Sequence, residues 1–183
     1  TITGGTGADV LNITADAGGA ALMTNVTNVG AVNILGTTAS QAITLVDGNA
    51  AAATATVARQ VLTVDASGLT TGVATINADA ETNAEIIIKG GAGDDIITIS
   101  SSTVVGDVIT AGNGDDRIRI SQSADLTAAD SIDGGADGTA AGDVGDQLVF
   151  AANSTVTDAQ LTLVSNISTI TADANILLNV TLG

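Results

Sequence analysis

The sequence predicts an all-β protein, a parallel β-roll or β-helix whose glycine-rich turns join to strands of a β-sandwich or a wide β-helix. Three observations favour this fold class. Short runs of Thr, Val and Ile lie between Gly, Asn and Asp, as strands lie between turns. Apolar and small polar residues alternate through the middle of the chain. A motif rich in glycine and aspartate recurs in phase with short β-branched segments.

The composition of the 183 residues restricts the chemistry. The formal net charge is −16, from 20 acidic and 4 basic residues, and His, Cys, Trp, Tyr and Pro are absent. Imidazole or thiol catalysis and ordinary zinc or haem sites are therefore excluded. Nucleic acid is not an expected partner, because it requires a basic surface and stacking aromatics. No apolar run approaches the ~18 residues of a membrane-spanning helix. Carboxylates and backbone carbonyls remain, the ligands that suit calcium.

The recurring motif is Gly-Gly-x-Gly-x-Asp-x-(Leu/Ile)-x. Gly4–Asn12 and Gly90–Thr98 fit it at every fixed position, and Ala111–Arg119 lacks only the first glycine. Gly134 to Gly138 starts another turn, which an insertion interrupts. Five aspartates each precede a Leu or Ile by two positions: Asp9, Asp95, Asp107, Asp116 and Asp146. Ordinary Gly-Asp surface turns are the simpler interpretation, and several instances in phase argue against it.

The motif has a physical rationale. Glycine can turn the backbone tightly with its carbonyls pointing inward, and the aspartate adds a carboxylate, so that together they form an oxygen cage for a hard cation. The Leu or Ile that follows points inward, and stacked turns bury a thin aliphatic column. The candidate metal ligands are Gly4, Gly5, Gly7, Asp9, Gly90, Gly91, Ala92, Gly93, Asp95, Asp107, Gly112, Asn113, Gly114, Asp116, Gly135, Asp137 and Asp146.

The nonapeptide resembles the repeats of the RTX (repeats-in-toxin) calcium-binding β-roll family. The resemblance covers Gly4–Asn12 and roughly Gly90–Phe150. It implies a parallel β-roll that binds several Ca²⁺ ions, each shared between turns n and n+2. Asp95 and Asp116 would then flank one ion, with Asp107 on the opposite edge. The three residues Ile99-Ser100-Ser101 interrupt the nine-residue spacing.

A longer repeat is also present. Val26-Thr27-Asn28-Val29 matches Val164-Ser165-Asn166-Ile167 at an offset of 138, and Asp9 matches Asp146 at an offset of 137. The segment "VTLG", which ends the chain, follows "ITLV" (Ile43 to Val46) by 137 residues. These landmarks predict a tandem unit of about 137 residues, with chance similarity of Thr- and Val-rich strands as the alternative. The expected regions are 1–14, a calcium turn that closes a preceding unit; 15–89, strands; 90–150, the RTX-like roll; and 151–183, strands that open the next unit.

Smaller features complete the expected organisation. Arg117-Ile118-Arg119-Ile120 alternates as a strand with Ile inward. Its arginines form either a solvated face or a contact with an acidic neighbouring subunit. Short helical turns are expected only at 125–131 and 157–163. Asp94-Asp95 and Asp115-Asp116 are not expected to be catalytic pairs, because sequence neighbours alternate faces and no substrate-binding aromatics accompany them. We therefore do not expect an enzyme.

Two longer stretches narrow the resemblance. The segment "LTVDASGLTTGVATINADAETNAEIIIKGGAGDDIIT" is similar to units of bacterial surface-layer and large secreted RTX proteins, and "VFAANSTVTDAQLTLVSNISTI" is similar to the segment that opens the next unit. The resemblance implies a secreted bacterial protein at the cell surface or outside the cell. We expect a self-assembling structural subunit of a surface layer or filament, which calcium folds and rigidifies.

Two alternatives remain, a spacer module of an RTX adhesin and the calcium-binding tail of a secreted hydrolase or toxin. The expected partners are other copies of the chain. A cell-surface polysaccharide would be contacted through regions outside this chain.

Overall fold

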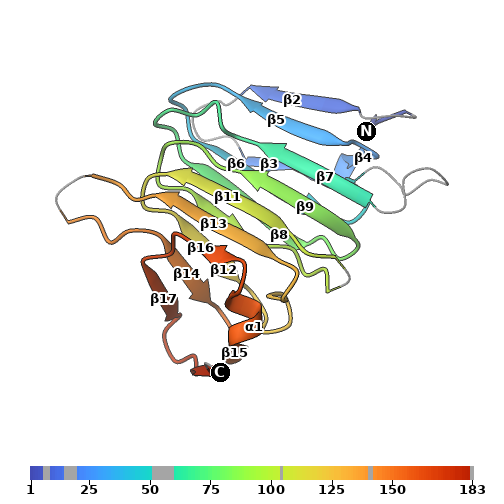
Figure 1. Cartoon of the computed structure of the whole chain (residues 1–183). Helices are drawn as coiled ribbons and strands as arrows, with labels where there is room; N and C mark the ends of the chain where they lie inside the picture. Colours follow the sequence, from blue (N-terminus) through green and yellow to red (C-terminus); the bar gives the residue numbers. More distant parts are fainter. Residues whose placement is uncertain (6–8, 15–19, 51–59, 104, 140–141, 182–183) are drawn as a thin grey trace.

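The computed structural model describes residues 1–5, 9–14, 20–50, 60–103, 105–139 and 142–181. These residues form an all-β parallel β-solenoid of seven turns with almost no helix. Each turn adds one strand to each of two parallel sheets, which face each other across a narrow interior (Figure 1). The predicted all-β β-helix is confirmed, and of the two arrangements expected for the middle region, the wide β-helix is the one observed.

The two large sheets have seven strands each. Sheet I contains, in order, β2 (Val10–Thr14), β5 (Ala31–Leu35), β7 (Gln60–Asp65), β9 (Ala84–Lys89), β11 (Val108–Asn113), β13 (Ser131–Ala136) and β16 (Val164–Ser165). Sheet II contains β3 (Ala20–Leu22), β6 (Gln41–Val46), β8 (Ala74–Ala80), β10 (Ile96–Thr98), β12 (Arg117–Ile120), β14 (Gln147–Phe150) and β17 (Thr169–Ala172).

Four short strands form two small parallel pairs. β1 (Ile2–Thr3) pairs with β4 (Val26–Thr27), and β15 (Ser154–Thr157) pairs with β18 (Leu178–Thr181). A 3₁₀ turn covers Met23–Asn25, and the α-helix α1 covers Asp158–Leu161. α1 lies within the predicted helical segment 157–163, and the backbone N–H of Thr157, the residue before it, donates to Oε1 of Gln160. The segment 125–131 forms turns and the start of β13, not a helix.

Two aliphatic columns, each with one residue per turn, run through the core, which also contains other buried side chains of the same strands, such as Ile34, Leu45, Ile86 and Phe150. In sheet I the column is Leu11, Val32, Val64, Ile88, Ile109, Ile132 and Val164. In sheet II it is Ile43, Ile76, Ile97, Ile118, Leu148 and Ile170. Every Leu or Ile that follows a motif aspartate by two positions belongs to one of these columns. The predicted inward direction of these residues is therefore confirmed.

The connections between the sheets form two long edges. Edge 1 contains the connections from sheet I to sheet II, and edge 2 contains those from sheet II to sheet I. In Figure 1, edge 1 lies on the left, where the loop after β13 projects, and edge 2 lies on the right. The strands of residues 60–89 occupy the same two sheets as those of 90–150, so the solenoid continues through both regions.

Candidate functional site

Edge 1 carries buried aspartates in three successive turns. Asp95, Asp116 and Asp146 each stand directly before a strand of sheet II, and their exposed fractions are 0 %, 1 % and 0 %. The glycines that precede them allow the chain to leave sheet I tightly enough to place these carboxylates inside the edge. We call these three residues the inner ladder.

Hydrogen bonds connect the inner ladder from turn to turn. The backbone N–H of Ala74 donates to Oδ1 of Asp95 at 2.7 Å. The N–H of Asp95 donates to Oδ1 of Asp116 at 2.7 Å, and that of Asp116 donates to Oδ1 of Asp146 at 2.7 Å. Each carboxylate thus binds the backbone of the preceding turn at the point where its strand begins. The ladder fixes the register of neighbouring turns.

The other carboxylate oxygen, Oδ2, has a hydrogen-bond partner in only one of the three inner-ladder residues. Oδ2 of Asp95 accepts the N–H of Gly91 at 2.6 Å. Oδ2 of Asp116 and Oδ2 of Asp146 are buried and have no hydrogen-bond partner. A buried oxygen without a partner costs about 1–3 kcal/mol, and more when it is charged. A proton, a water molecule or a cation would satisfy these two atoms.

The ionisation of the inner ladder reflects this cost. Burial raises the pKa of Asp95 to about 6. Burial, together with the neighbouring charges of Asp95 and Asp146, raises the pKa of Asp116 to about 7. Burial also raises the pKa of Asp146, with Asp137 and Asp115 adding to the effect. Three adjacent carboxyls are thus poised to bind positive charge.

Glycines line edge 1 because successive turns lie too close for a side chain. Gly112 and Gly135 have φ of +123° and +104°, and a Cβ on either would collide with a backbone carbonyl, that of Gly91 and that of Gly112 respectively. The N–H of Asn113 donates to the carbonyl of Gly91 at 3.1 Å. The glycines of the motif therefore have a packing function that requires no metal. They also stack carbonyl oxygens along the edge beside the inner ladder.

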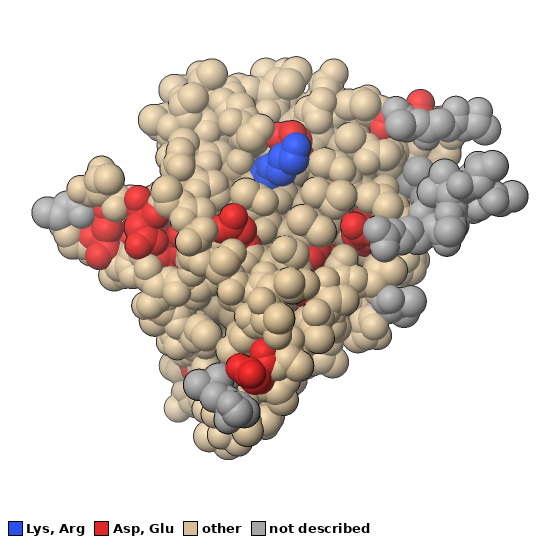
Figure 2. Space-filling view, viewed as in Figure 1, with Lys and Arg blue, Asp and Glu red and all other residues tan. Residues whose placement is uncertain are grey.

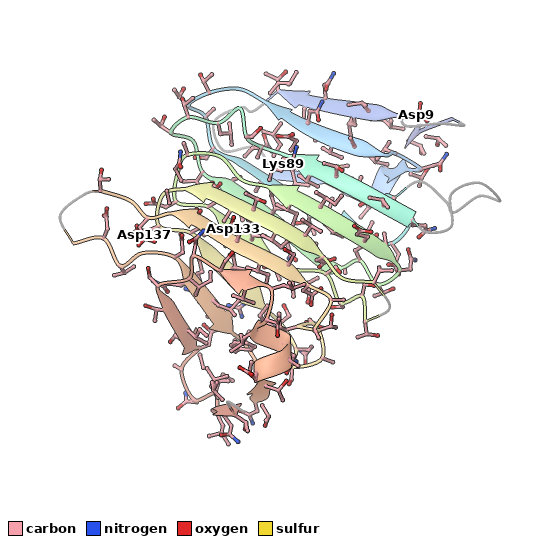
Figure 3. The ribbon with its side chains drawn as sticks, in the orientation of Figure 1. Asp9, Lys89, Asp133 and Asp137 are labelled. Atoms are coloured by element: carbon pink, nitrogen blue, oxygen red, sulfur yellow. The ribbon has the colours of Figure 1, made fainter. Side chains whose placement is uncertain are left out.

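A second row of acidic side chains lies outside the inner ladder. This outer row consists of Asp94, Asp115, Asp137 and Asp143. Oδ1 of Asp94 accepts the N–H of Asp115 at 3.0 Å, and Oδ1 of Asp115 accepts that of Gly138 at 2.9 Å. Acidic atoms gather at the left edge in Figure 2, where Figure 3 labels Asp137. Edge 1 therefore combines buried and exposed carboxylates in one strip.

The end of this strip has a shallow hollow beside Asp137. Gly135, Asn166, Ile167 and Ser168 complete its lining. Oδ2 of Asp137 accepts the Ser168 hydroxyl at 3.0 Å, and its Oδ1 accepts the N–H of Asp146 at 3.1 Å. Asp137 thus connects the projecting loop to the inner ladder.

Edge 2 holds a different ladder, in which both oxygens of each aspartate have partners. Oδ1 of Asp107 accepts the N–H of Ile86 at 3.2 Å, and its Oδ2 accepts that of Ser100 at 2.8 Å. Oδ1 of Asp130 accepts the N–H of Asp107 at 2.7 Å, and its Oδ2 accepts that of Thr127 at 2.6 Å. Burial raises the pKa of Asp107 to about 6 and also raises that of Asp130. This ladder is complete as a structural device.

The first motif lies on edge 2, far from the other complete copy. Figure 3 places Asp9 on the opposite side of the molecule from Asp137. The carbonyl of Asp9 accepts the N–H groups of Gly30 and Ala31 at 2.8 and 3.1 Å, and its buried Oδ2 has no partner. Gly4 and Gly5 lie beside it, whereas Gly7 lies outside the described residues.

The structure thus separates the predicted ligands into two groups. Edge 1 contains Gly90, Gly91, Ala92, Gly93, Asp95, Gly112, Asn113, Gly114, Asp116, Gly135, Asp137 and Asp146, and edge 2 contains Gly4, Gly5, Asp9 and Asp107. Asp95 and Asp116 share an edge and Asp107 lies on the other. Within the described residues, no three acidic side chains converge as a ready metal-binding group. An ion at edge 1 would therefore also need carbonyl ligands.

Sequence reasoning missed several residues of these ladders. Asp130 precedes Ile132 by two positions, so it carries the same signal as the five aspartates that were identified. Asp94 and Asp115 precede motif aspartates directly, but nothing in the sequence says that they pair across turns. Two further residues at edge 2 were also not predicted. Oε1 of Glu81 accepts the N–H groups of Asn83 and Ala84. Nδ2 of Asn49 donates to the carbonyls of Met23 and Val26.

The described part of the chain has no helix long and apolar enough to cross a membrane. No protein-family model, no curated protein and no solved structure matches this sequence or its fold.

Proposed function

We propose that the chain is a self-assembling structural protein outside the cell, in a surface layer or filament, whose solenoid is rigidified by calcium along edge 1. The observation that supports this most directly is the pair of buried, unpartnered oxygens, Oδ2 of Asp116 and Oδ2 of Asp146. They lie in successive turns of edge 1, which also carries the outer acidic row. The resemblance of the motif to RTX repeats supports the same ion.

The electrostatic argument favours a divalent cation. A net charge of −16 on 183 residues disfavours the compact state, and burial of the inner ladder adds a desolvation cost. Calcium accepts six to eight oxygen ligands of mixed type at flexible geometry. Carboxylates and glycine carbonyls of edge 1 are ligands of this type.

The positions of the carboxylates along edge 1 indicate which residues would hold calcium. Asp116 and Asp146 would supply buried carboxylate oxygens, and the outer residues Asp115 and Asp137 would supply exposed ones. Backbone carbonyls of the glycine stack would complete the ligand set. When bound, calcium neutralises the carboxylates and links neighbouring turns, so that metal binding and folding are coupled.

Assembly is supported by the ends of the solenoid. Ile170 of the sheet II column is 38 % exposed, and Val180 of β18 is 40 % exposed. Terminal strands with half-exposed apolar side chains and one unpaired edge favour association. Other copies of the chain are therefore the proposed partners.

A second candidate function is a calcium-stabilised spacer in a large RTX adhesin. It is favoured by the stacking of turns in a single direction, because such a solenoid can extend as a rod. A spacer would remain monomeric when calcium binds, whereas a layer or filament subunit would polymerise.

Calcium titration from a chelated start tests the proposal. Far-ultraviolet circular dichroism would follow folding, and light scattering on the same sample would follow size. We expect β-signal and particle size to rise together and to reverse with chelator, with magnesium as the matched control ion. Folding without growth would favour the spacer. The absence of any response to millimolar calcium would refute the proposed calcium binding.

A further inference from the structure

The longer sequence repeat is also a structural repeat. In the first copy, β2 pairs with β5 through Val10↔Ala31 and Leu11↔Val32. In the second, β14 pairs with β17 through Gln147↔Thr169 and Leu148↔Ile170. The same offsets, 137 for the first strand and 138 for the second, relate both pairs. The two strand pairs therefore have the same register.

Backbone hydrogen bonds and φ angles also agree between the two copies of the repeat at these offsets. The carbonyl of Asp9 accepts the N–H groups of Gly30 and Ala31, and the carbonyl of Asp146 accepts those of Ser168 and Thr169. Asn28 and Asn166 have φ of +58° and +52°. Added Cβ atoms on Gly4 and Gly134 would meet the carbonyls of these same two asparagines. Chance similarity between Thr- and Val-rich strands would not reproduce these features.

The two copies lie on opposite sides of the solenoid. β2 belongs to sheet I, whereas its equivalent β14 belongs to sheet II. Between them the chain makes eleven successive passages from one sheet to the other, which is five and a half turns. At about 4.8 Å per turn, the unit advances about 26 Å along the axis. Likewise β4 of one small pair corresponds to β16 of sheet I, and β6 of sheet II corresponds to β18 of the other small pair, so consecutive units are shifted by one sheet position about the axis.

Equivalent residues differ sharply in burial. Val32 is 0 % exposed, and its equivalent Ile170 is 38 % exposed. Ile43 is 1 % exposed, and its equivalent Val180 is 40 % exposed. In the first copy β7 and β8 stack on these strands, with Val64 opposite Val32 and Ile76 opposite Ile43. Within the described residues, no strand stacks in that place on β17 or β18.

We infer that the C-terminal end of this solenoid receives the following turn of a second copy of the repeat unit, in the place that β7 and β8 hold on the first copy. Its equivalent of Val64 would cover Ile170, and its equivalent of Ile76 would cover Val180. Its equivalent of Asn49 would donate to the carbonyls of Leu161 and Val164, as Asn49 does to those of Met23 and Val26 at 2.7 and 2.6 Å. The inference rests on the fold and not on calcium.

The test appends residues 47–136 after Gly183, which continues the repeat at its own offset. Amide hydrogen exchange then measures protection of residues 169–172 and 178–181. The matched control carries Asp in place of Val64 and Ile76 of the appended copy only. We expect protection to rise about tenfold or more in the extended chain, relative to the control, and the extended chain to unfold in one transition.

Two results would overturn the inference. One is equal protection of the two strands in the extended chain and its control. The other is strong, concentration-dependent protection in the unextended chain that the extension does not increase, because the end of another molecule would then be the occupant. Neither result depends on a calcium response, so this test and the calcium titration can fail separately.

Discussion

The backbone N–H of Asp116 donates to Oδ1 of Asp146 at 2.7 Å, across one turn of the solenoid, while Oδ2 of Asp146 is buried without a partner. One oxygen of the carboxylate therefore holds the structure together, and the other leaves a negative site inside it. Asp116 has the same arrangement with respect to Asp95. A cation would use the second oxygen without breaking the ladder.

The first prediction concerns Asp116→Asn. The amide oxygen retains an acceptor for the Asp95 N–H, but the variant removes the negative charge. We expect wild type to gain thermal stability with calcium, and the variant to lose most of this gain. Asp158→Asn is the control, because this exposed helix residue removes the same charge away from edge 1. Equal calcium responses in the two variants would argue against an ion at Asp116.

The second prediction concerns pH in the presence of chelator. Burial raises the folded-state pKa of Asp95 and Asp107 to about 6 and that of Asp116 to about 7, above the ordinary value near 4. Between pH 4 and 7 the folded state therefore binds more protons than the unfolded state, so the free energy of unfolding falls as pH rises. The urea midpoint should be higher at pH 5 than at pH 7.5.

Calcium should weaken or reverse this pH dependence, because it competes with protons for the same carboxylates. A metal-free protein that becomes more stable from pH 5 to 7.5 would contradict the assigned burial of these groups.

The third prediction separates close packing from backbone strain. Gly112→Ala introduces a methyl group at φ +123° against the carbonyl of Gly91, whereas Gly48→Ala introduces one at φ +88° with no atom within 4 Å. We expect Gly48→Ala to cost about 1 kcal/mol and Gly112→Ala about 3 kcal/mol or more. Urea unfolding measures both. Similar costs would mean that the turns at edge 1 can move apart.

The fourth prediction concerns the two arginines of β12. Ile118 and Ile120 point inward as expected, and Arg117 and Arg119 each lie 2.9 Å from the carboxylate of Asp173 in the same chain. The three side chains are 31–42 % exposed, so Asp173→Asn should cost only about 1 kcal/mol. This cost should shrink at 1 M salt. If the loss of stability did not change with salt, it would come from lost packing and not from lost charge interactions.

Much of the fold could be predicted because the two-residue step from Asp to Leu or Ile marks where each strand enters the core. Asp95 to Ile97 and Asp116 to Ile118 follow this step in successive turns. Edge 2 tolerates loops of different length, such as the one that contains Ser100 and Ser102, both buried. The three residues that interrupt the nine-residue spacing are absorbed there, so the aspartates of edge 1 still align.

The features of the fold and site that could not be predicted depend on contacts between turns. The alternation of apolar and polar residues along a single strand does not reveal such contacts. The alternating residues of β7 and β8 suit a sandwich as well as a solenoid, because both bury one face of each strand. The pairing of Asp94 with Asp115 requires the stacking of two turns that are 21 residues apart. The ion that the ladder would bind is inferred from the motif's resemblance and from unpartnered oxygens, and it stays a prediction.

The shift of one sheet position between consecutive units determines where a rod of such units would display its loops. The acidic loop after β13 is longer than its counterpart after β1 by seven residues, since Gly134 follows Gly4 by 130 positions and Asp146 follows Asp9 by 137. This corner thus accepts insertions without loss of register. Asp146 lies at edge 1 and its equivalent Asp9 lies at edge 2, so in a tandem array equivalent loops of two consecutive units would project from different edges, about 26 Å apart along the axis. A tag or domain inserted there would be presented on different edges of consecutive units.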